Sequence, residues 1–215
     1  MQLHPNDDFR FQRAIDLLLD TGFVLDRNVV WMDLGCHQGQ FLKKVISQFD
    51  VRGVGSDDWS ESQKGPESIS WEYFKADLDK ELPWPMEVDV ISAFEVLEHM
   101  IDTDGFLKRV FDKLRAGGYV LISTPNINSL RNRVTVPFGA YPVGLEYRNL
   151  IHHVRLYNAK LLARHLRDSG FIDIRVRGVS FLPLSGKFGA TELSAKLANL
   201  MPALCNNILA IGRKP

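Results

Sequence analysis

Carboxylate and imidazole side chains gather in two short stretches of this sequence. Glu95, Glu98 and His99 are spaced so that all three would share one face of a helix. His152 and His153 form a second group further along the chain. A histidine can take a proton from a hydroxyl group near neutral pH, and a divalent metal ion held by such side chains can lower the pKa of that hydroxyl. We therefore expect base or metal chemistry at these residues.

A turn rich in glycine follows an apolar stretch that ends on an acid. The composition predicts a strand over 29–33 that ends at Asp33, and a helix from about 40 to 48. Gly35 and Gly39 stand between them, so the bare backbone can approach a ligand while helix amides point at its anionic part. The spacing does not supply the three-glycine fingerprint of dinucleotide sites. The turn predicts a pocket for a different cofactor.

The same turn resembles the acid-x-Gly-x-Gly-x-Gly signature of the class I S-adenosylmethionine-dependent methyltransferases. Asp33, Gly35 and Gly39 match it, and His37 stands where the middle glycine is usual. If position 37 needs a positive φ, histidine is among the residues that tolerate it, at a cost of roughly 1 to 2 kcal/mol.

Two longer stretches resemble the same family. Residues 89–99 and 114–126 look like segments of the ubiquinone-pathway O-methyltransferases and related small-molecule enzymes. The resemblance keeps order and spacing over roughly residues 29–171, which is more specific than one turn. It implies a Rossmann-like fold and S-adenosylmethionine as cofactor.

The resemblance places the cofactor at the ends of successive strands. Asp57 would accept the ribose hydroxyls, with Asp58 as the register alternative. The family pattern can also be matched to 53–55, where the acid is missing, and the two acids could instead cap a following helix. Asp77 would meet the adenine amino group, and the backbone of Leu78 its ring. The other implied cofactor residues are Asp33, Gly35, Cys36, His37, Gly39, Phe94 and Glu95.

The resemblance also implies a metal set. By position, Glu95, Glu98, His99 and His153 match the metal ligands of the small-RNA 3′-terminal 2′-O-methyltransferases, and such a set suits manganese, iron or zinc better than magnesium. Two alternatives stay open: His99 or His153 acts as a base beside Glu98 without a metal, or both histidines are structural. We favour a catalytic histidine.

The segment 126–155 is too long and too aromatic for an ordinary connection. We expect a lid in which aromatic side chains shape the acceptor pocket and arginines meet an anionic group. The alternative is a solvated loop. The candidate substrate-binding residues are Asn126, Arg131, Tyr141, Tyr147 and His152.

The composition limits the partners and the cellular compartment that we expect. The 215 residues carry 26 basic and 26 acidic side chains, which gives no overall field toward nucleic acid or anionic membrane. The two cysteines lack metal-ligand spacing and indicate a reducing compartment. The N-terminus lacks the features of a signal peptide, and no apolar run is long enough to span a membrane. We expect a cytoplasmic protein.

Strand and helix signals alternate along the chain, which predicts an α/β fold: a Rossmann-like, doubly wound, mostly parallel sheet with an antiparallel closing strand. We expect one domain over 1–215 with inserts near 126–155 and 178–206. The expected strands are 29–33, 52–55, 70–74, 88–94, 119–123, 172–177 and 207–213. The expected helices are 8–20 (capped by Asn6 and ended by Gly22), 40–48, a short one after Ser60, 104–114, 158–169 and an amphipathic stretch near 192–200.

Together these features predict a methyltransferase that acts on oxygen in a small hydroxylated metabolite or sugar. Two alternatives remain. An RNA 3′-terminal 2′-O-methyltransferase is disfavoured by the zero net charge and by the absence of an added RNA-binding module. A catalytically silent cofactor-binding scaffold is suggested by His37 in the glycine turn and by the uncertain acid near Asp57.

Overall fold

The computed structural model describes residues 5–58, 71–82, 84–142, 153–179 and 192–215. Its helices are α1 Pro5–Leu19, α2 Gln40–Phe49, α3 Thr103–Lys113, α4 Leu130–Thr135, α5 Ala159–Asp168 and α6 Glu192–Leu200. Its strands are β1 Val30–Leu34, β2 Arg52–Asp57, β3 Glu72–Lys75, β4 Val88–Phe94, β5 Leu114–Pro125, β6 Ile172–Gly178 and β7 Asn207–Arg213. Short 3-10 turns cover Leu97–His99, Val136–Phe138 and Pro202–Leu204. Within the described residues, no helix is long and apolar enough to cross a membrane.

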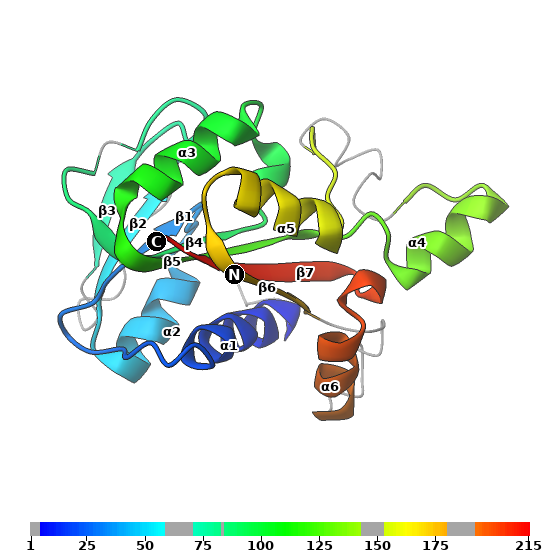
Figure 1. The fold of residues 1–215 in the computed structure, drawn as a ribbon, viewed down its shortest axis with the longest axis horizontal. Helices are drawn as coiled ribbons and strands as arrows, with labels where there is room; N and C mark the ends of the chain where they lie inside the picture. Colours follow the sequence, from blue (N-terminus) through cyan, green and yellow to red (C-terminus); the bar gives the residue numbers. More distant parts are fainter. Residues whose placement is uncertain (1–4, 59–70, 83, 143–152, 180–191) are drawn as a thin grey trace.

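The seven strands form one sheet in the order β3-β2-β1-β4-β5-β7-β6 (Figure 1). Neighbours from β3 through β5 pair in parallel, whereas β7 pairs antiparallel with both β5 and β6. The strand order switches sides between β1 and β4: β2 and β3 lie on one side of β1, and β4 and β5 lie on the other. In such sheets ligands bind beyond the carboxyl ends of the strands at this switch point. The predicted fold class is confirmed.

Helices cover both faces of the sheet (Figure 1). On one face α1 and α2 bury apolar side chains such as Ile15 and Phe41, and on the other α3 and α5 bury Phe106 and Leu162. Parallel strands covered on both faces must be apolar along their whole length, and β1 is buried at all five positions. This packing fixes where the strand ends lie.

Most expected boundaries hold within two residues. The bounds of β4 and β7, and of α6, are those predicted. Asn158 caps α5, its side chain accepting a hydrogen bond from the Leu161 amide. Asn6, however, lies inside α1 instead of capping it, because the helix already begins at Pro5. The short helix expected after Ser60 lies outside the described residues.

Strand β5 begins five residues before the predicted Tyr119. The stretch that contains Gly117 and Gly118 reads as a turn, but Leu114 already pairs with Val88 and a register shift absorbs the extra residues. Backbone hydrogen bonds between this stretch and Lys214 satisfy it further. Pairing with the strands on both sides therefore outweighs the preference of Gly117 and Gly118 for a turn.

A buried carboxyl group joins β1 to β4. Asp33 is 4% exposed, and the Ser92 hydroxyl donates a hydrogen bond to its Oδ1 at 2.6 Å. Burial raises the pKa of Asp33 to about 7, although the Ser92 hydrogen bond and the charge of Arg10 act in the opposite direction. Asp33 is therefore largely protonated in the folded protein below that pH.

This raised pKa makes folding stability depend on pH. Between about pH 4 and pH 7 the folded chain binds a proton at Asp33 that the unfolded chain does not, so the free energy of unfolding falls as the pH rises. Asp33→Asn keeps the shape of the group and removes this titration. Across that window we expect the free energy of unfolding of the wild type, measured with urea, to fall by on the order of 1 to 3 kcal/mol more than that of Asp33→Asn. Parallel pH curves for the two proteins would contradict the buried protonated carboxyl.

Candidate functional site at the carboxyl edge of the sheet

The turn after β1 is held open by its backbone conformation. Gly35, His37 and Gly39 have φ values of 69°, 49° and 70°, in the left-handed region. His37 thus adopts the conformation for which glycine is usual, and its backbone carries the strain expected of a residue with a Cβ. The amides of Gly35 and Cys36 both donate to the Ser56 carbonyl of β2, at 2.8 and 3.0 Å. The turn is therefore anchored to the neighbouring strand.

The turn also packs too closely for side chains at its glycines. A Cβ on Gly35 would lie 2.5 Å from Val96, and one on Gly39 would lie 2.5 Å from Trp71. The Cys36 side chain is buried, and burial raises the pKa of its thiol. The turn thus presents backbone to the carboxyl edge of the sheet, as a binding cradle for a cofactor requires.

Asp57 faces this turn from the end of β2. Its Oδ2 accepts a hydrogen bond from the His37 amide at 2.8 Å, while Asp58 is exposed. The alternative match to 53–55 falls in the middle of the strand, because β2 continues to Asp57. The Tyr73 hydroxyl of β3 donates to the Asp57 carbonyl at 2.8 Å. Of the acids considered, Asp57 is the one directed at the glycine turn.

Asp77 stands beyond the end of β3. Its carboxylate pairs with Lys80 at 2.7 Å and accepts a hydrogen bond from the Asp79 amide, and the hydrogen bond from Lys80 lowers the pKa of Asp77. Leu78 is buried, and its carbonyl accepts a hydrogen bond from Arg109. These contacts order the loop beside Asp57, although the Asp77 side chain itself points to solvent and to its own loop.

Glu95 follows β4 in the left-handed conformation, with φ 56°. Its Oε1 accepts a hydrogen bond from the Ser123 hydroxyl at 2.7 Å, and its Oε2 accepts one from the Asn207 amide at 2.8 Å. Arg10 of α1 pairs with the same carboxylate at 3.1 Å. Phe94, half-buried, lies beneath Arg10, whose guanidinium is 6.0 Å from the ring centre. Glu95 is therefore engaged by three different elements.

Sequence reasoning missed Arg10, Ser123 and Asn207. The sequence around Arg10 predicts only an amphipathic helix. The sequence from Asn207 onward predicts only the last strand of the sheet. Nothing local links either of them to Glu95, more than 80 residues away in the sequence. A residue of this kind becomes visible only when the topology brings the elements together.

Glu98, His99 and His153 form a compact group next to Glu95. One ligand atom from each of the three lies within 4.8 Å of those of the other two. The rings of His99 and His153 meet edge to face, with centres 4.7 Å apart. Glu98 is 1% exposed, and within the part of the chain that the structure describes neither carboxylate oxygen has a hydrogen bond of ordinary geometry, although the nearby Thr124 hydroxyl acts to lower its pKa. Burial, with the charge of Glu95, raises the pKa of Glu98 to about 8.

His153 reaches this group because the chain after it is tied to Glu98. The amides of Val154 and Arg155 both donate to the Glu98 carbonyl, at 2.9 and 3.1 Å. The predicted approach of a segment more than 50 residues downstream is therefore present in the structure. The Glu98 backbone holds the segment, and its side chain faces the two imidazoles.

Glu95 does not belong to this group, which corrects the expected four-residue set. The prediction assumed a helix from Glu95 onward, whereas the structure has a single 3-10 turn over Leu97–His99 that begins after it. The left-handed backbone at Glu95 turns its side chain toward Ser123 and Asn207 instead. Glu95 acts on the group through its charge.

The expected lid differs from its prediction in the part that the structure describes. Asn126 is buried, and its side-chain amide donates to the carbonyls of Ala203 and Cys205, so it clamps the chain instead of facing an acceptor. Arg131 is exposed, and Tyr141 is 70% exposed. Figure 1 shows α4 projecting away from the sheet. Tyr147 and His152 lie outside the described residues.

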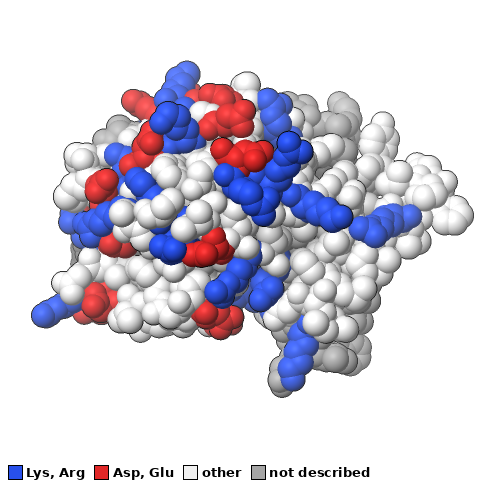
Figure 2. All heavy atoms as spheres, viewed as in Figure 1, with Lys and Arg blue, Asp and Glu red and all other residues white. Residues whose placement is uncertain are grey.

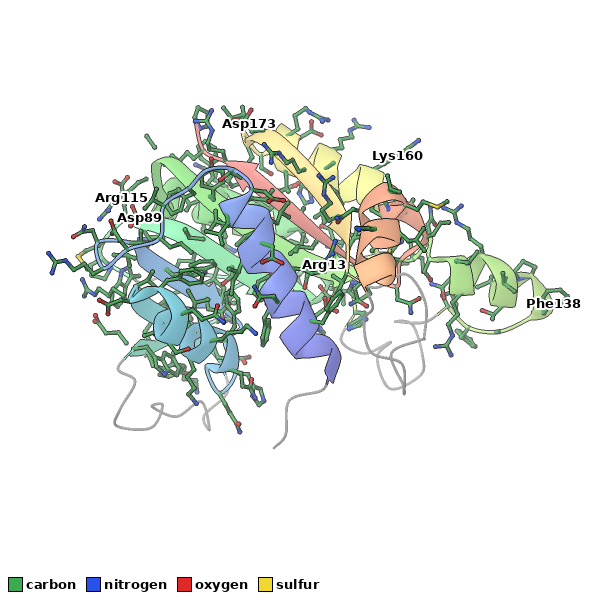
Figure 3. The ribbon with its side chains drawn as sticks, turned by 90° about the horizontal axis from the view of Figure 1, so that it is seen from below. Arg13, Asp89, Arg115, Phe138, Lys160 and Asp173 are labelled. Carbon is green, nitrogen blue, oxygen red and sulfur yellow. The ribbon has the colours of Figure 1, made fainter. Side chains whose placement is uncertain are left out.

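The charge on this projecting arm is of one sign. Residues 126–142 carry Arg131 and Arg133 and no acidic side chain. Figure 2 shows blue without red on the arm in that view, whereas red and blue are mixed over the large body to its left. Phe138 is 87% exposed and stands at its tip (Figure 3).

A family model described as a methyltransferase domain matches residues 7–176. Among curated proteins, a ubiquinone biosynthesis O-methyltransferase of Thiobacillus denitrificans is 27% identical over 193 residues, covering 84% of this chain and 82% of that protein. A ubiquinone biosynthesis O-methyltransferase of Cupriavidus pinatubonensis is 29% identical over 101 residues, which cover 47% of this chain and 41% of that protein. The match thus spans less than half the length of the latter relative.

Solved structures share the fold at low identity. A possible histamine N-methyltransferase of Thermotoga maritima superposes with a TM-score of 0.64 at 15% identity, covering 98% of this chain and 91% of that chain. Phosphoethanolamine N-methyltransferase 2 of Haemonchus contortus, in complex with S-adenosylmethionine, gives 0.64 at 16% identity over 95% of this chain and 52% of that chain.

The family match covers most of the chain, and the sheet order, the glycine turn and the acids at the strand ends agree with it. The chain belongs to the methyltransferase domain family and is a class I S-adenosylmethionine-dependent methyltransferase.

Proposed function

We propose that this enzyme transfers a methyl group from S-adenosylmethionine to a hydroxyl group of a small molecule, at the edge of the sheet where Glu98, His99 and His153 meet. The observation that carries the proposal is this group of a buried carboxylate and two imidazoles, whose ligand atoms lie within 4.8 Å of one another. A hydroxyl acceptor must lose its proton, and such a group can remove or stabilise it. The likeness to ubiquinone biosynthesis O-methyltransferases supports oxygen as the acceptor atom.

The glycine turn fits the cofactor. Its backbone is free of side chains at Gly35 and Gly39, where a Cβ would collide with neighbours. Asp57 would accept the ribose hydroxyls while it holds the turn through the His37 amide, and Arg10 would offer positive charge to the amino-acid end. When bound, S-adenosylmethionine supplies an electrophilic methyl group on a sulfonium whose departure needs no proton.

In this proposal the cofactor would lie next to the imidazole group. Val96 packs against Gly35 of the turn and lies only two residues before Glu98, so the cradle and the imidazole group adjoin. The chain's main tasks are then to hold the acceptor oxygen in line, at roughly 3 to 3.5 Å from the methyl carbon, and to accept its proton. His99 or His153 can take that proton, since an imidazole nitrogen is the general base that enzymes use most often.

The three ligand atoms also fit a divalent metal. Two imidazoles and one carboxylate are the protein ligands of several catalytic zinc sites, which keep further positions open for water or substrate. The burial of Glu98 supports this, because a cation would compensate a carboxylate whose oxygens have no hydrogen bond of ordinary geometry among the described residues. A metal held there would lower the pKa of a bound hydroxyl. The metal-free base is the second candidate, and the two differ in their response to chelators.

Cofactor binding tests the turn. Replacing Asp57 by Ala removes the proposed charge-assisted hydrogen bonds, so calorimetry should show S-adenosylhomocysteine binding weakened by roughly 10- to 150-fold, or about 1.5 to 3 kcal/mol. Gly35→Val should abolish binding. Asp58→Ala is the matched control and should leave affinity unchanged. A loss of affinity in Asp58→Ala but not in Asp57→Ala would move the ribose site to the other acid.

The imidazole group is tested by metal binding and by activity. We expect Mn²⁺ or Zn²⁺ titrations to show a site that is lost in Glu98→Gln and His153→Ala and kept in Glu95→Gln, since Glu95 lies outside the group. Activity on a hydroxylated acceptor should then vanish with a chelator and return with metal.

If activity instead survives chelation, the base role predicts a fall of roughly 10² to 10⁴ in His99→Ala or His153→Ala. Full activity in both alanine variants would remove the group from the mechanism. Retained cofactor binding with no turnover on any acceptor would favour the silent scaffold.

A further inference from the structure

The arm of residues 126–142 ends in an exposed apolar tip. Val134, Val136, Phe138 and Tyr141 are large apolar side chains, and all four are exposed. Residues 134–142 carry no charged side chain. Figure 3 places Phe138 at the far end of the arm, and 87% of this residue is exposed. Exposed apolar side chains that gather on one projection mark a surface that binds a partner.

The backbone of the tip makes hydrogen bonds within itself. The Gly139 amide donates to the Val136 carbonyl at 2.9 Å, and the Ala140 amide donates to the Thr135 carbonyl at 3.2 Å. Pro137 has no amide proton to satisfy. Gly139 has φ 84°, the left-handed conformation that reverses the chain. The tip is therefore a closed turn, and these amides would stay satisfied if it entered an apolar medium.

Positive charge stands at the base of the arm. Arg131 and Arg133 are exposed, and residues 126–142 hold no acidic side chain. Across the described part of the chain, neither guanidinium group forms an ion pair with a carboxylate. Arg133 contacts the Ala203 carbonyl at 3.4 Å, which holds it beside the body of the molecule. An apolar tip with cations behind it matches a partner that is apolar inside and anionic at its surface.

We propose that the arm docks on an anionic lipid bilayer, with Phe138 among the acyl chains and the two arginines at the lipid phosphates. Phe138 follows Arg131 by seven positions along a helical segment. That separation is roughly 10 Å, at about 1.5 Å per residue. Apolar groups of interfacial segments reach roughly 5 to 10 Å into a bilayer, so both contacts can form together. Tyr141 suits the boundary between them, because tyrosine favours the membrane interface.

A bilayer fits this tip better than a second copy of the chain does. The clefts whose linings the structure describes hold mainly charged and polar side chains, among them Arg13, Asp16, Asp104 and Asp168, which do not match an aromatic tip. The whole chain has zero net charge, so the attraction comes from the arm itself. The arm follows the carboxyl end of β5, which lies parallel to β4 (Figure 1). Docking would thus turn the proposed methyl-transfer edge toward the bilayer.

Vesicle binding by the full chain tests the apolar tip. The protein is sedimented with vesicles made of equal parts of phosphatidylcholine and phosphatidylglycerol, and vesicles of phosphatidylcholine alone are the reference. We expect stronger binding to the anionic vesicles, which falls on the order of tenfold in Phe138→Ser. Val24→Ser is the matched control, because it removes an exposed apolar side chain from the segment between α1 and β1. It should bind as the wild type does.

The same vesicles test the charge of the arm. Arg131→Gln should weaken binding to the anionic vesicles roughly fivefold, because one cation near the surface is lost. Arg167→Gln removes the same charge from an exposed position of α5 and should change nothing.

A dye whose emission depends on polarity measures insertion directly. It is attached to the new thiol of Phe138→Cys, since both native cysteines, Cys36 and Cys205, are buried. We expect the emission to shift to the blue on anionic vesicles. An unchanged emission would contradict the insertion of the tip.

Three other results would overturn the docking surface. The wild type could fail to bind anionic vesicles, or Phe138→Ser could bind them as well as Val24→Ser does. The third is a dimer that Phe138→Ser abolishes, together with no vesicle binding, which would assign the tip to a second copy. None of these measurements involves methyl transfer, so the docking surface can fail while the proposed activity stands.

Discussion

A carboxyl group is buried where the carboxyl ends of the central strands meet. Within the described residues neither oxygen of Glu98 has a hydrogen bond of ordinary geometry, although the nearby Thr124 hydroxyl acts to lower its pKa, and burial of an uncompensated charge costs several kcal/mol. The chain meets this cost in part by raising the pKa of Glu98 to about 8, so the group is largely neutral at pH 7 when nothing is bound. A cation beside it would favour the charged form. The local structure follows from this residue, since its carbonyl also holds the segment that carries His153.

The proposed cofactor cradle depends on the same strand ends. The glycine turn is tied to β2 through Ser56 and Asp57, and packs on Val96 just before the imidazole group. Arg10 links α1 to Glu95, whose charge in turn raises the pKa of Glu98. Close packing thus joins the turn to the segment that carries the imidazole group, and the charges of Arg10 and Glu95 join the N-terminal helix to it.

The sequence predicted those features whose signal is local. The bounds of β4 and β7, and those of α5 to within one residue, follow from composition and spacing, and the tolerance of His37 for positive φ follows from its residue type. The start of β5 could not be predicted, because strand pairing overrides the glycines that read as a turn. Arg10 and Asn207 carry no sequence signal for their contact with Glu95. The assumed helix at Glu95 was wrong because a single left-handed residue redirects the side chain.

The most direct test of this account is a crystal structure with S-adenosylhomocysteine bound. We predict density along the glycine turn, with the ribose hydroxyls in hydrogen-bond contact with Asp57 and the sulfur atom directed at the space beside Glu98, His99 and His153. Ribose contacts to Asp58 alone would correct the register of the site. A ligand bound away from the turn, or a sulfur atom remote from the imidazole group, would contradict the account.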